Sequence, residues 1–222
     1  MTEVAERGVE RADMLADIRT LVGLTRRDTG VDAIAPAVLA AMERVPRHRF
    51  VPDNLQEFAY ADGPLPIGHG QTISQPFIVA LMTHLLELGP AARVLEIGTG
   101  CAYQTAVLAE LAGRVYSIEV VEPLATAAAA RLARLGYGNV ELRHGDGYLG
   151  WPEEAPFDGI MVTAAAPHVP PPLVEQLKTG AKLVIPVDRG LGQELMTIQK
   201  RDDGEVDARA VLPVAFVPLV RP

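Results

Sequence analysis

From Arg93 onward, short apolar runs of strand length alternate with stretches of helical spacing, and this alternation constrains the fold more than any other feature. Five runs are typical of buried strands: residues 94–97, 114–120, 139–146, 157–166 and 181–187. Helical stretches fall at 102–112, 123–135 and, opened by prolines, 169–178. The alternation predicts an α/β fold with a doubly wound, Rossmann-like and mostly parallel sheet.

The N-terminal part of the chain is predicted to be helical. Residues 14–25 and 35–45 carry apolar residues at helical spacing, and Asp32 is the expected cap of the second helix. Residues 60–73 are rich in Gly and Pro and predict a loop. Ser74 then precedes the amphipathic stretch QPFIVALMTHLLEL, in the position of a helix N-cap.

At the C-terminal end, QELMTIQKR and ARAVLPVAFVPLV are expected to form an antiparallel pair with Gly204 in the turn between them. The chain of 222 residues has the length of one domain. We therefore predict a single domain over 1–222, with an N-terminal helical part at 1–60 and an active-site loop and catalytic core at 61–222.

The composition is that of an ordinary globular protein with an acidic surface. The formal net charge is −8 and the pI is about 5.1, which disfavours general nucleic-acid binding because an acidic surface repels phosphates. No apolar run reaches the length of about 18 residues typical of a membrane span, and MTEVAERGVERADM lacks the apolar stretch of a secretory signal. A lone cysteine, Cys101, permits no intramolecular disulfide, and the histidines lack metal-ligand spacing. We expect a cytoplasmic protein without metal, nucleic-acid or membrane partners.

Acidic residues and glycines follow three consecutive strands of the predicted sheet. Gly98, Thr99 and Gly100 come after the first strand, Glu119 ends the second, and Asp146-Gly147 follows the third. Ligands of such sheets bind beyond the carboxyl ends of the strands. There, glycines let the backbone approach a ligand, a carboxylate accepts ribose hydroxyls, and an Asp reaches the exocyclic amine of an adenine. Each residue alone is typical of an ordinary turn or solvated strand end, but together they indicate a nucleoside site.

The first of these turns favours S-adenosylmethionine over a dinucleotide. The dinucleotide fingerprint needs a third glycine where this chain has Tyr103. Glu96 also places a negative charge at the turn, which suits a cationic sulfonium better than a pyrophosphate.

The loop after the fourth strand, Thr163-Ala164-Ala165-Ala166-Pro167, offers only small side chains and backbone groups to an acceptor. An acceptor that is already an anion, such as a carboxylate, needs no base from the protein.

Several longer motifs make the sequence more specific. The chain resembles the protein-L-isoaspartate (D-aspartate) O-methyltransferase family in LPIGHGQTISQP (65–76), VLEIGTG (94–100), NVELRHGDGYLGW (139–151), APFDGIMVTAAAP (155–167), LVIPV (183–187) and FVPL (216–219). VLEIGTG is typical of many methyltransferases, whereas GQTISQP is the family-specific element. The resemblance extends from about Val45 to Leu219 and implies a Rossmann-like methyltransferase fold.

The resemblance implies a protein-repair enzyme. Such enzymes transfer a methyl group from S-adenosylmethionine to the free carboxylate of L-isoaspartyl residues in damaged proteins and peptides. Ser74 matches the family's active-site serine, and we expect its hydroxyl to orient the substrate carboxylate by alignment rather than act as a nucleophile. The resemblance also implies a monomer, and it places the segment 214–219 along the substrate peptide.

The residues expected to bind S-adenosylmethionine come from the resemblance and the strand-end turns together, and they are Thr72, Ile73, Glu96, Gly98, Thr99, Gly100, Glu119, Asp146 and Gly147.

The sequence departs from the family pattern at three positions. Cys101 and Ala102 replace the usual Ser-Gly, and the methyl group of Ala102 costs strain if the backbone there has positive φ. Ala215 stands where an arginine commonly precedes FVPL, so a charge contact from that position is lost. Two alternatives therefore stay open: a carboxyl methyltransferase acting on a dedicated partner peptide, and a non-catalytic S-adenosylmethionine-binding module.

Overall fold

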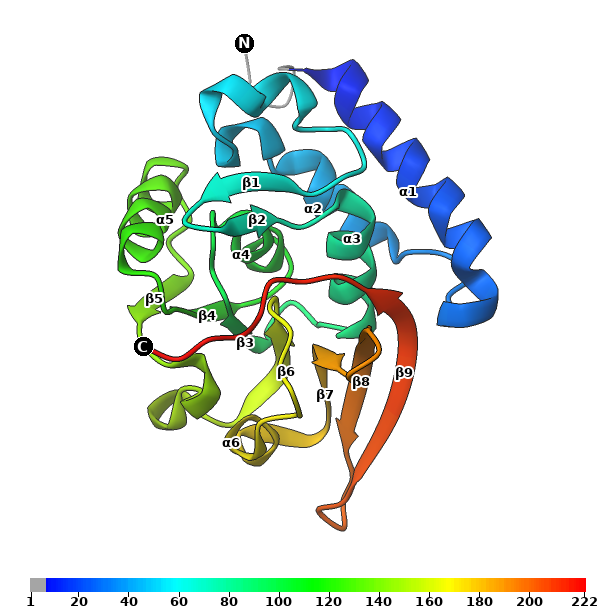
Figure 1. Ribbon diagram of the computed structural model, residues 1–222, viewed down its shortest axis with the longest axis vertical. Coiled ribbons are helices and arrows are strands. Elements are labelled where there is room, and N and C mark those ends of the chain that lie inside the picture. Colours follow the sequence, from blue (N-terminus) through cyan, green and yellow to red (C-terminus); the bar gives the residue numbers. More distant parts are fainter. Residues whose placement is uncertain (1–6) are drawn as a thin grey trace.

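The computed structural model describes residues 7–222, and its centre is a seven-stranded sheet of order β5-β4-β3-β6-β7-β8-β9 (Figure 1). The strands are β3 (Arg93–Ile97), β4 (Arg114–Glu119), β5 (Val140–His144), β6 (Phe157–Val162), β7 (Leu177–Asp188), β8 (Gln193–Lys200) and β9 (Val206–Val214). β3 to β7 pair in parallel, and β8 and β9 add antiparallel strands at one edge. The prediction of a mostly parallel sheet with an antiparallel C-terminal end is confirmed.

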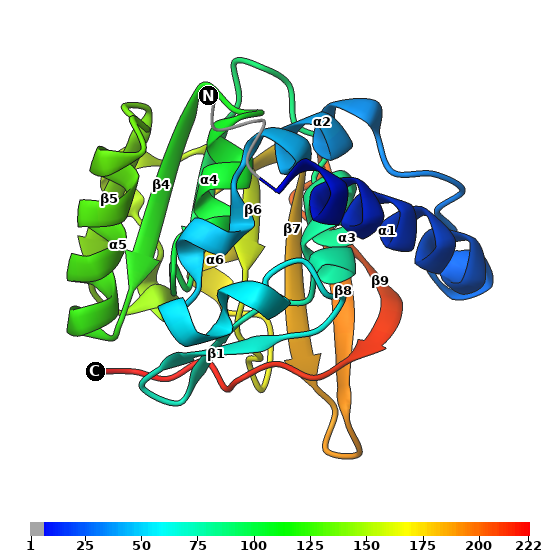
Figure 2. The same ribbon diagram turned by 90° about the horizontal axis from the view of Figure 1, so that it is seen from above.

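The two faces of the sheet are covered unequally. On one face, Val94, Val115 and Met161 pack with residues of α1 (Gly8–Thr29), α2 (Pro36–Arg44), α3 (Pro76–Leu85), α4 (Tyr103–Ala109) and α5 (Glu122–Arg134). On the other face, Leu95 and Tyr116 pack with the short α6 (Pro171–Glu175) and nearby loops. Adjacent residues of one strand point to opposite faces, so continuous apolar strands supply both cores. Figure 2 shows α1, α2 and α3 close together on the side of the sheet near β7 and β8.

Residues 60–73, predicted as a loop, contain a two-stranded hairpin of β1 (Leu65–Gly68) and β2 (Gln71–Ile73). The loop prediction is wrong there because Leu65 and Ile67 alternate with exposed residues and pack against the core. Gly68, His69 and Gly70 all have positive φ and form the turn. Two short 3₁₀ helices, η2 (Arg47–Phe50) and η3 (Asp53–Phe58), precede the hairpin.

Two predicted helix caps are wrong. α2 begins after Ala35 rather than at Asp32, with Pro36 in its first turn. α3 begins after Gln75 rather than Ser74, and the amide of Phe77 is capped by the side chain of Asp62, which accepts it at 3.0 Å. A residue distant in the chain therefore supplies the cap, and Ser74 is left free of that role.

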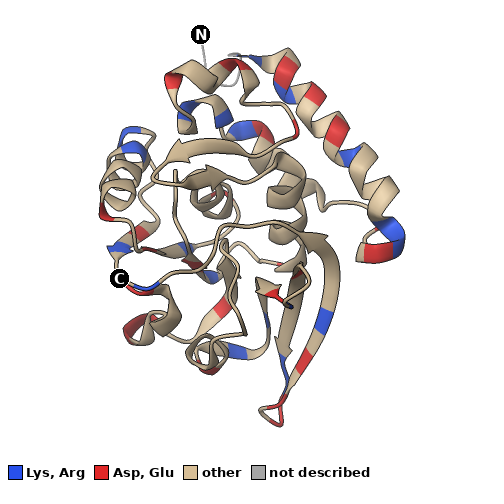
Figure 3. Cartoon of the chain, viewed as in Figure 1, with Lys and Arg blue, Asp and Glu red and all other residues tan. Residues whose placement is uncertain are grey.

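The hairpin and the C-terminal segment lie side by side at the carboxyl end of the parallel strands (Figures 1 and 2). Both ribbons carry no charged residue between 65 and 73 or between 211 and 220, whereas charges gather on the outer helices and the β8–β9 turn (Figure 3). Among helices built by residues 7–222, none has the length and apolarity needed to span a bilayer. The expectation of no secretory signal concerns in part residues 1–6, which lie outside the described residues.

Candidate active site

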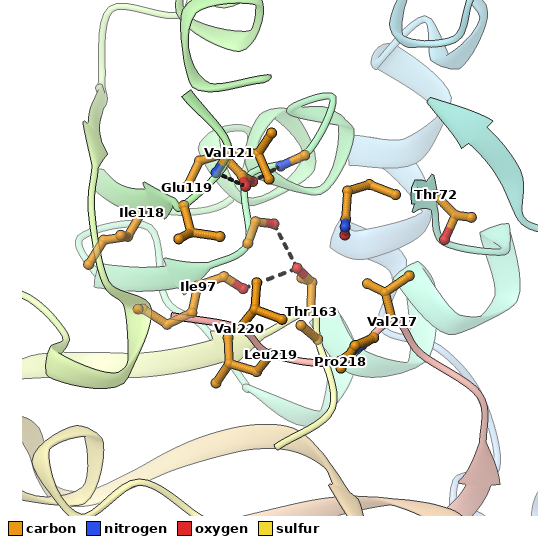
Figure 4. Close-up of a pocket in the computed structure, with 16 residues that line it drawn as sticks. Thr72, Ile97, Ile118, Glu119, Val121, Thr163, Val217, Pro218, Leu219 and Val220 are labelled. Atoms are coloured by element: carbon orange, nitrogen blue, oxygen red, sulfur yellow. Dashed lines mark hydrogen bonds between the residues drawn. The ribbon is translucent and has the colours of Figure 1, made fainter. Parts of the chain in front are cut away.

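A cavity opens at the carboxyl ends of β3, β4 and β6, and we call it the inner cavity (Figure 4). The residues that line it come from the hairpin, the strand ends and the C-terminal segment: Gln71, Thr72, Ile97, Gly98, Gly100, Ile118, Glu119, Val120, Val121, Gly147, Thr163, Ala164, Val217, Pro218, Leu219 and Val220. The strand order reverses between β3 and its neighbours β4 and β6, and ligands of doubly wound sheets bind at such a point.

The turn after β3 fits closely against the end of β6. Gly98 has φ +94°, and a Cβ atom there would lie 2.4 Å from Thr163 Oγ1. The Thr163 hydroxyl donates to the carbonyls of Gly98 at 2.6 Å and Ile97 at 3.0 Å (Figure 4). Only glycine fits at position 98. The floor of the cavity there is the backbone of Ile97 and Gly98, which the Thr163 side chain holds in place.

Glu119 supplies the carboxylate of the inner cavity. Its side chain is buried, Oε2 accepts from the amide of Gly100 at 2.7 Å, and Oε1 accepts from the amide of Val121 at 2.9 Å (Figure 4). Each carboxylate oxygen has a second lone pair. The carboxylate therefore holds the turn and still has capacity to accept hydrogen bonds from a ligand.

Glu96 lies behind the turn and does not line the inner cavity. It is fully buried, and its Oε2 accepts from Thr105 Oγ1 at 2.5 Å and Ser117 Oγ at 2.6 Å. The Ser117 hydroxyl is also 2.6 Å from Thr99 Oγ1, so a chain of polar groups connects Glu96 to the turn. Burial raises the pKa of Glu96 to about 7, although both hydroxyls and their hydrogen bonds oppose the shift.

The third strand end contributes Gly147 directly to the inner cavity. A Cβ atom on Gly147 would lie 2.3 Å from Ile97 Cγ2, so a side chain would clash with the cavity wall. Asp146 instead lines a surface groove beside the cavity, and its Oδ1 accepts from the amide of Tyr148 at 2.9 Å. It thereby caps the 3₁₀ helix η4 (Gly147–Leu149).

The C-terminal segment divides between two surfaces. Val217 to Val220 close one side of the inner cavity, and the backbone of Ala165 donates to Val217 and accepts from Leu219, both at 2.8 Å. The Tyr148 hydroxyl also donates to the Leu219 carbonyl at 3.1 Å. The segment 214–219, expected along the substrate, therefore covers the inner cavity from residue 217 onward.

Two further spaces adjoin the inner cavity. The junction cavity lies between the glycine turn after β3 and the hairpin. It is lined by Thr72, Ile73, Ser74, Val79, Gly98, Thr99, Gly100, Cys101, Tyr103, Gln104 and Thr163. The outer groove, about 570 Å³, is lined by Leu21, Thr25, Pro64, Thr72, Ser74, Gln75, Phe77, Ile78, Leu212, Pro213, Val214, Ala215 and Phe216. Thr72 and Ser74 line both spaces, so they form the wall between them.

Comparison with known proteins decides what this arrangement belongs to. Residues 24–222 match the family described as protein-L-isoaspartate(D-aspartate) O-methyltransferase. The chain belongs to this family. It is 56% identical over 207 residues to protein-L-isoaspartate O-methyltransferase 2 of a Polaromonas species, covering 93% of this chain and 98% of that protein. It is also 56% identical to the enzyme of the same name from Nitrosococcus oceani, covering 93% of this chain and 94% of that protein.

Solved structures agree with the family in fold. A structure titled protein-L-isoaspartate O-methyltransferase superposes with a TM-score of 0.81 at 27% identity, covering 94% of this chain and 65% of that longer protein. A putative family member from Plasmodium falciparum, solved in complex with S-adenosyl-L-homocysteine, gives a TM-score of 0.75 at 28% identity and covers 92% of this chain and 98% of that protein. The prediction of a Rossmann-like methyltransferase fold is confirmed.

The structure brings most of the predicted site residues together around the inner and junction cavities. Glu96 and Asp146 are the two that line neither space. Sequence reasoning missed Val120 and Val121 as lining residues, and their position directly after strand β4 was the signal that could have identified them. Thr163, expected to face the acceptor, lines the inner cavity and holds the turn at Gly98.

The structure shows the surroundings of the three residues that depart from the family pattern. Cys101 is buried, and burial raises the pKa of its thiol, so it remains protonated at neutral pH. The backbone of Ala102 has φ +69°, a left-handed conformation that favours glycine, and its side chain is fully buried. Ala215 is exposed on the outer groove.

Proposed function

We propose that this chain transfers a methyl group from S-adenosylmethionine to the free α-carboxylate of L-isoaspartyl residues, with the donor in the inner and junction cavities and the peptide in the outer groove. The observation that carries the proposal is the shared wall of Thr72 and Ser74. A donor in the junction cavity and an acceptor in the outer groove both lie next to these two residues. The methyl group then passes from one to the other without entering bulk solvent.

The residues of the inner cavity fit an adenosyl donor. At Gly98 and Gly147 a Cβ atom would clash with Thr163 and Ile97, so both positions require glycine and present backbone to the inner cavity. Apolar groups of Ile118, Val120 and Leu219 offer surfaces for a planar ring, and Glu119 presents carboxylate oxygens at the end of β4. This combination of an apolar slot with a carboxylate at the rim suits an adenine and a ribose.

We assign supporting roles to Glu96 and Asp146, which line neither cavity, and to Thr72 and Ile73 on the hairpin. Glu96 holds Thr99 through Ser117 and so stiffens the turn. Asp146 lines the adjoining surface groove next to Gly147, and in this proposal its carboxylate accepts from the exocyclic amine of the adenine. Thr72 and Ile73 hold the hairpin side of the junction cavity.

The chemistry requires alignment more than acid–base catalysis. S-adenosylmethionine supplies an electrophilic methyl group on a sulfonium sulfur. A carboxylate is already a nucleophile at neutral pH, because its ordinary pKa is near 4. The Ser74 hydroxyl donates a hydrogen bond that fixes the carboxylate in line with the methyl group, while Phe216 and Phe77 keep the approach apolar. The new ester C–O bond forms as the C–S bond breaks, and no proton moves.

The substrate class follows from the open acceptor side. The side chain of Gln193 holds both the amide and the carbonyl of Phe216, so the exposed backbone at Ala215 is the part that suits the main chain of an extended peptide. Binding through main-chain groups requires little of the peptide's sequence. We propose that the enzyme acts as a monomer in the cytoplasm on isoaspartyl-containing proteins and peptides.

Methyl transfer to an isoaspartyl peptide, compared with its normal aspartyl twin, tests the function. We expect labelling of the isoaspartyl peptide alone. Labelling of neither peptide, with S-adenosylhomocysteine still bound, would favour a non-catalytic module or a dedicated partner peptide. Equal labelling of both would exclude a repair enzyme.

A further inference from the structure

Arg47 is a fully buried arginine that forms no hydrogen bond with a carboxylate. Its Nε donates to the carbonyl of Ala59 and its Nη2 to the carbonyl of Ser74, both at 2.7 Å. Its Nη1 is buried and has no partner among the described residues. Burial lowers the pKa of Arg47, but a guanidinium stays charged at neutral pH. The protein therefore holds a cation directly behind the Ser74 backbone with no hydrogen-bonded counterion, and the Asp62 carboxylate is close enough to act on it only through space.

The two carbonyls that Arg47 contacts stand on either side of the hairpin. Ala59 precedes residues 60–73, and Ser74 follows them. One planar guanidinium thus ties together both ends of the segment that separates the junction cavity from the outer groove. Displacement of this group would move Ser74 relative to the donor side.

The Arg47 guanidinium also lies next to the junction cavity, because it packs on the ring of Tyr103. The guanidinium carbon of Arg47 lies 4.7 Å from the centroid of the Tyr103 ring, and Tyr103 lines that cavity. The Tyr103 hydroxyl is buried and has no hydrogen-bond partner in the part of the chain that the structure describes. Burial raises the pKa of Tyr103 to about 12, so the tyrosine is neutral and contributes no compensating charge.

Neither the junction cavity nor the outer groove has a lysine, arginine or histidine among its lining residues. Ala215 supplies no charge at the groove, and Asp62 uses its oxygens on the Gln75 side chain at 2.6 Å and the Phe77 amide at 3.0 Å. An anionic acceptor that enters these apolar spaces loses hydration, and that loss must be offset. Arg131 donates to the carbonyl of Cys101, on the glycine-turn side of the junction cavity, at 2.9 Å. Arg47 is the cation that contacts the Ser74 wall, on the acceptor side, and is placed to offset that loss there.

We propose that Arg47 is a positioning residue that fixes Ser74 and, through its charge, makes the site selective for an anionic acceptor. This inference rests on the proposed function, because the acceptor carboxylate is the anion that Arg47 attracts. Arg47 acts across the Ser74 backbone and does not touch the acceptor.

The test uses two peptides that differ only in charge. One carries isoaspartate, and its twin carries isoasparagine, in which the free α-carboxylate is a carboxamide. Affinity for each is measured by calorimetry on the full chain saturated with S-adenosylhomocysteine. We expect the wild type to prefer the carboxylate peptide about tenfold, because a charge several ångströms away acts through a partly polar medium.

The variants separate charge from packing. Arg47→Lys retains the charge but loses the planar guanidinium that contacts the carbonyls of Ala59 and Ser74. Both peptides should therefore bind more weakly, while the preference for the carboxylate peptide stays. Arg47→Met removes the charge, so the two peptides bind equally. If Arg47→Met fails to fold, Arg47→Gln, which can still donate to the Ser74 carbonyl, takes its place with the same expected loss. A neutral variant that keeps the tenfold preference, or a wild type without one, would overturn the proposal.

Failure of the proposed function gives a different result. A wild type that methylates no isoaspartyl peptide refutes the function itself. A wild type that methylates it, together with a neutral variant that keeps the preference, refutes only the role of Arg47.

Discussion

The inner cavity and the outer groove are built in opposite ways. Turns at the ends of adjacent strands form the floor of the inner cavity, where hydrogen bonds of Glu119 and Thr163 hold them, and the hairpin and residues 217–220 close it. The outer groove is assembled from α1, the segment 64–78 and the segment 212–216, which lie far apart in the chain. The glycine turns of the inner cavity pack so closely against Thr163 and Ile97 that a Cβ atom would clash, whereas uncharged side chains of distant segments line the outer groove.

This difference separates a fixed function from a variable one. A donor that is the same in every reaction suits a rigid cradle at the end of a sheet, and a damaged residue in any protein suits an open, uncharged groove. Substitutions should therefore affect donor binding on one side of the Thr72–Ser74 wall and acceptor use on the other.

Gly98→Ala should produce the largest effect and disable the inner cavity. The new Cβ would meet Thr163 Oγ1 at 2.4 Å in a backbone with φ +94°. Overpacking and strain together should cost about 4 kcal/mol of stability or donor binding. Thermal unfolding and calorimetry with S-adenosylhomocysteine measure both. Gly138→Ala is the matched control, because Gly138 has no atom within 4 Å and no positive φ; equal behaviour of the two variants would contradict a close-fitting cradle.

Glu96→Gln should remove a pH dependence of the protein's stability that arises from a group behind the donor side. The folded-state pKa of Glu96 is raised to about 7 from 4.5, so the folded protein binds the proton more tightly than the unfolded chain. Stability from this group is present below about pH 4.5 and is lost as the pH rises to about 7, by roughly 3 kcal/mol. Urea unfolding at pH 5 and pH 8 should show wild type losing stability relative to Glu96→Gln. Parallel pH profiles of the two proteins would show that Glu96 does not titrate in this range.

Ser74→Ala should act only across the wall. S-adenosylhomocysteine affinity should stay within about twofold, while kcat falls roughly 30-fold because one orienting hydrogen-bond donor is removed. Thr25→Ala serves as control, since the Thr25 hydroxyl also lies in the groove but donates within α1 to the Leu21 carbonyl. Unchanged turnover for Ser74→Ala would remove the serine from the mechanism.

Ala215→Arg should give the smallest effect and sharpen the contrast from the acceptor side. A surface charge contributes up to about 1 kcal/mol, so the KM for an isoaspartyl peptide with a neighbouring glutamate should fall about threefold. A peptide with a neighbouring lysine should show the opposite shift, and S-adenosylhomocysteine affinity should not change. Ala215→Gln is the uncharged control. A change in donor affinity would mean that the two regions are coupled.

The inner cavity was largely predictable because local sequence encodes it. Strand periodicity locates Gly98, Glu119 and Gly147 at one edge of the sheet, and the edge brings them together. The burial of Glu96 was not predictable, because its partners Thr105 and Ser117 come from other elements.

The acceptor side was less predictable for the same physical reason. The Asp62 cap, the hairpin and the Arg47 contacts all depend on packing between distant segments. Local propensity therefore predicted a loop at residues 60–73 and a cap at Ser74, whereas tertiary contacts determined both.

The structure of a ternary complex with S-adenosylhomocysteine and an isoaspartyl peptide tests the central claim most directly. We predict the cofactor sulfur in the junction cavity and the peptide's α-carboxylate in the outer groove, within hydrogen-bond distance of Ser74 Oγ. A peptide bound elsewhere, or a serine hydroxyl turned away from the carboxylate, would contradict the account.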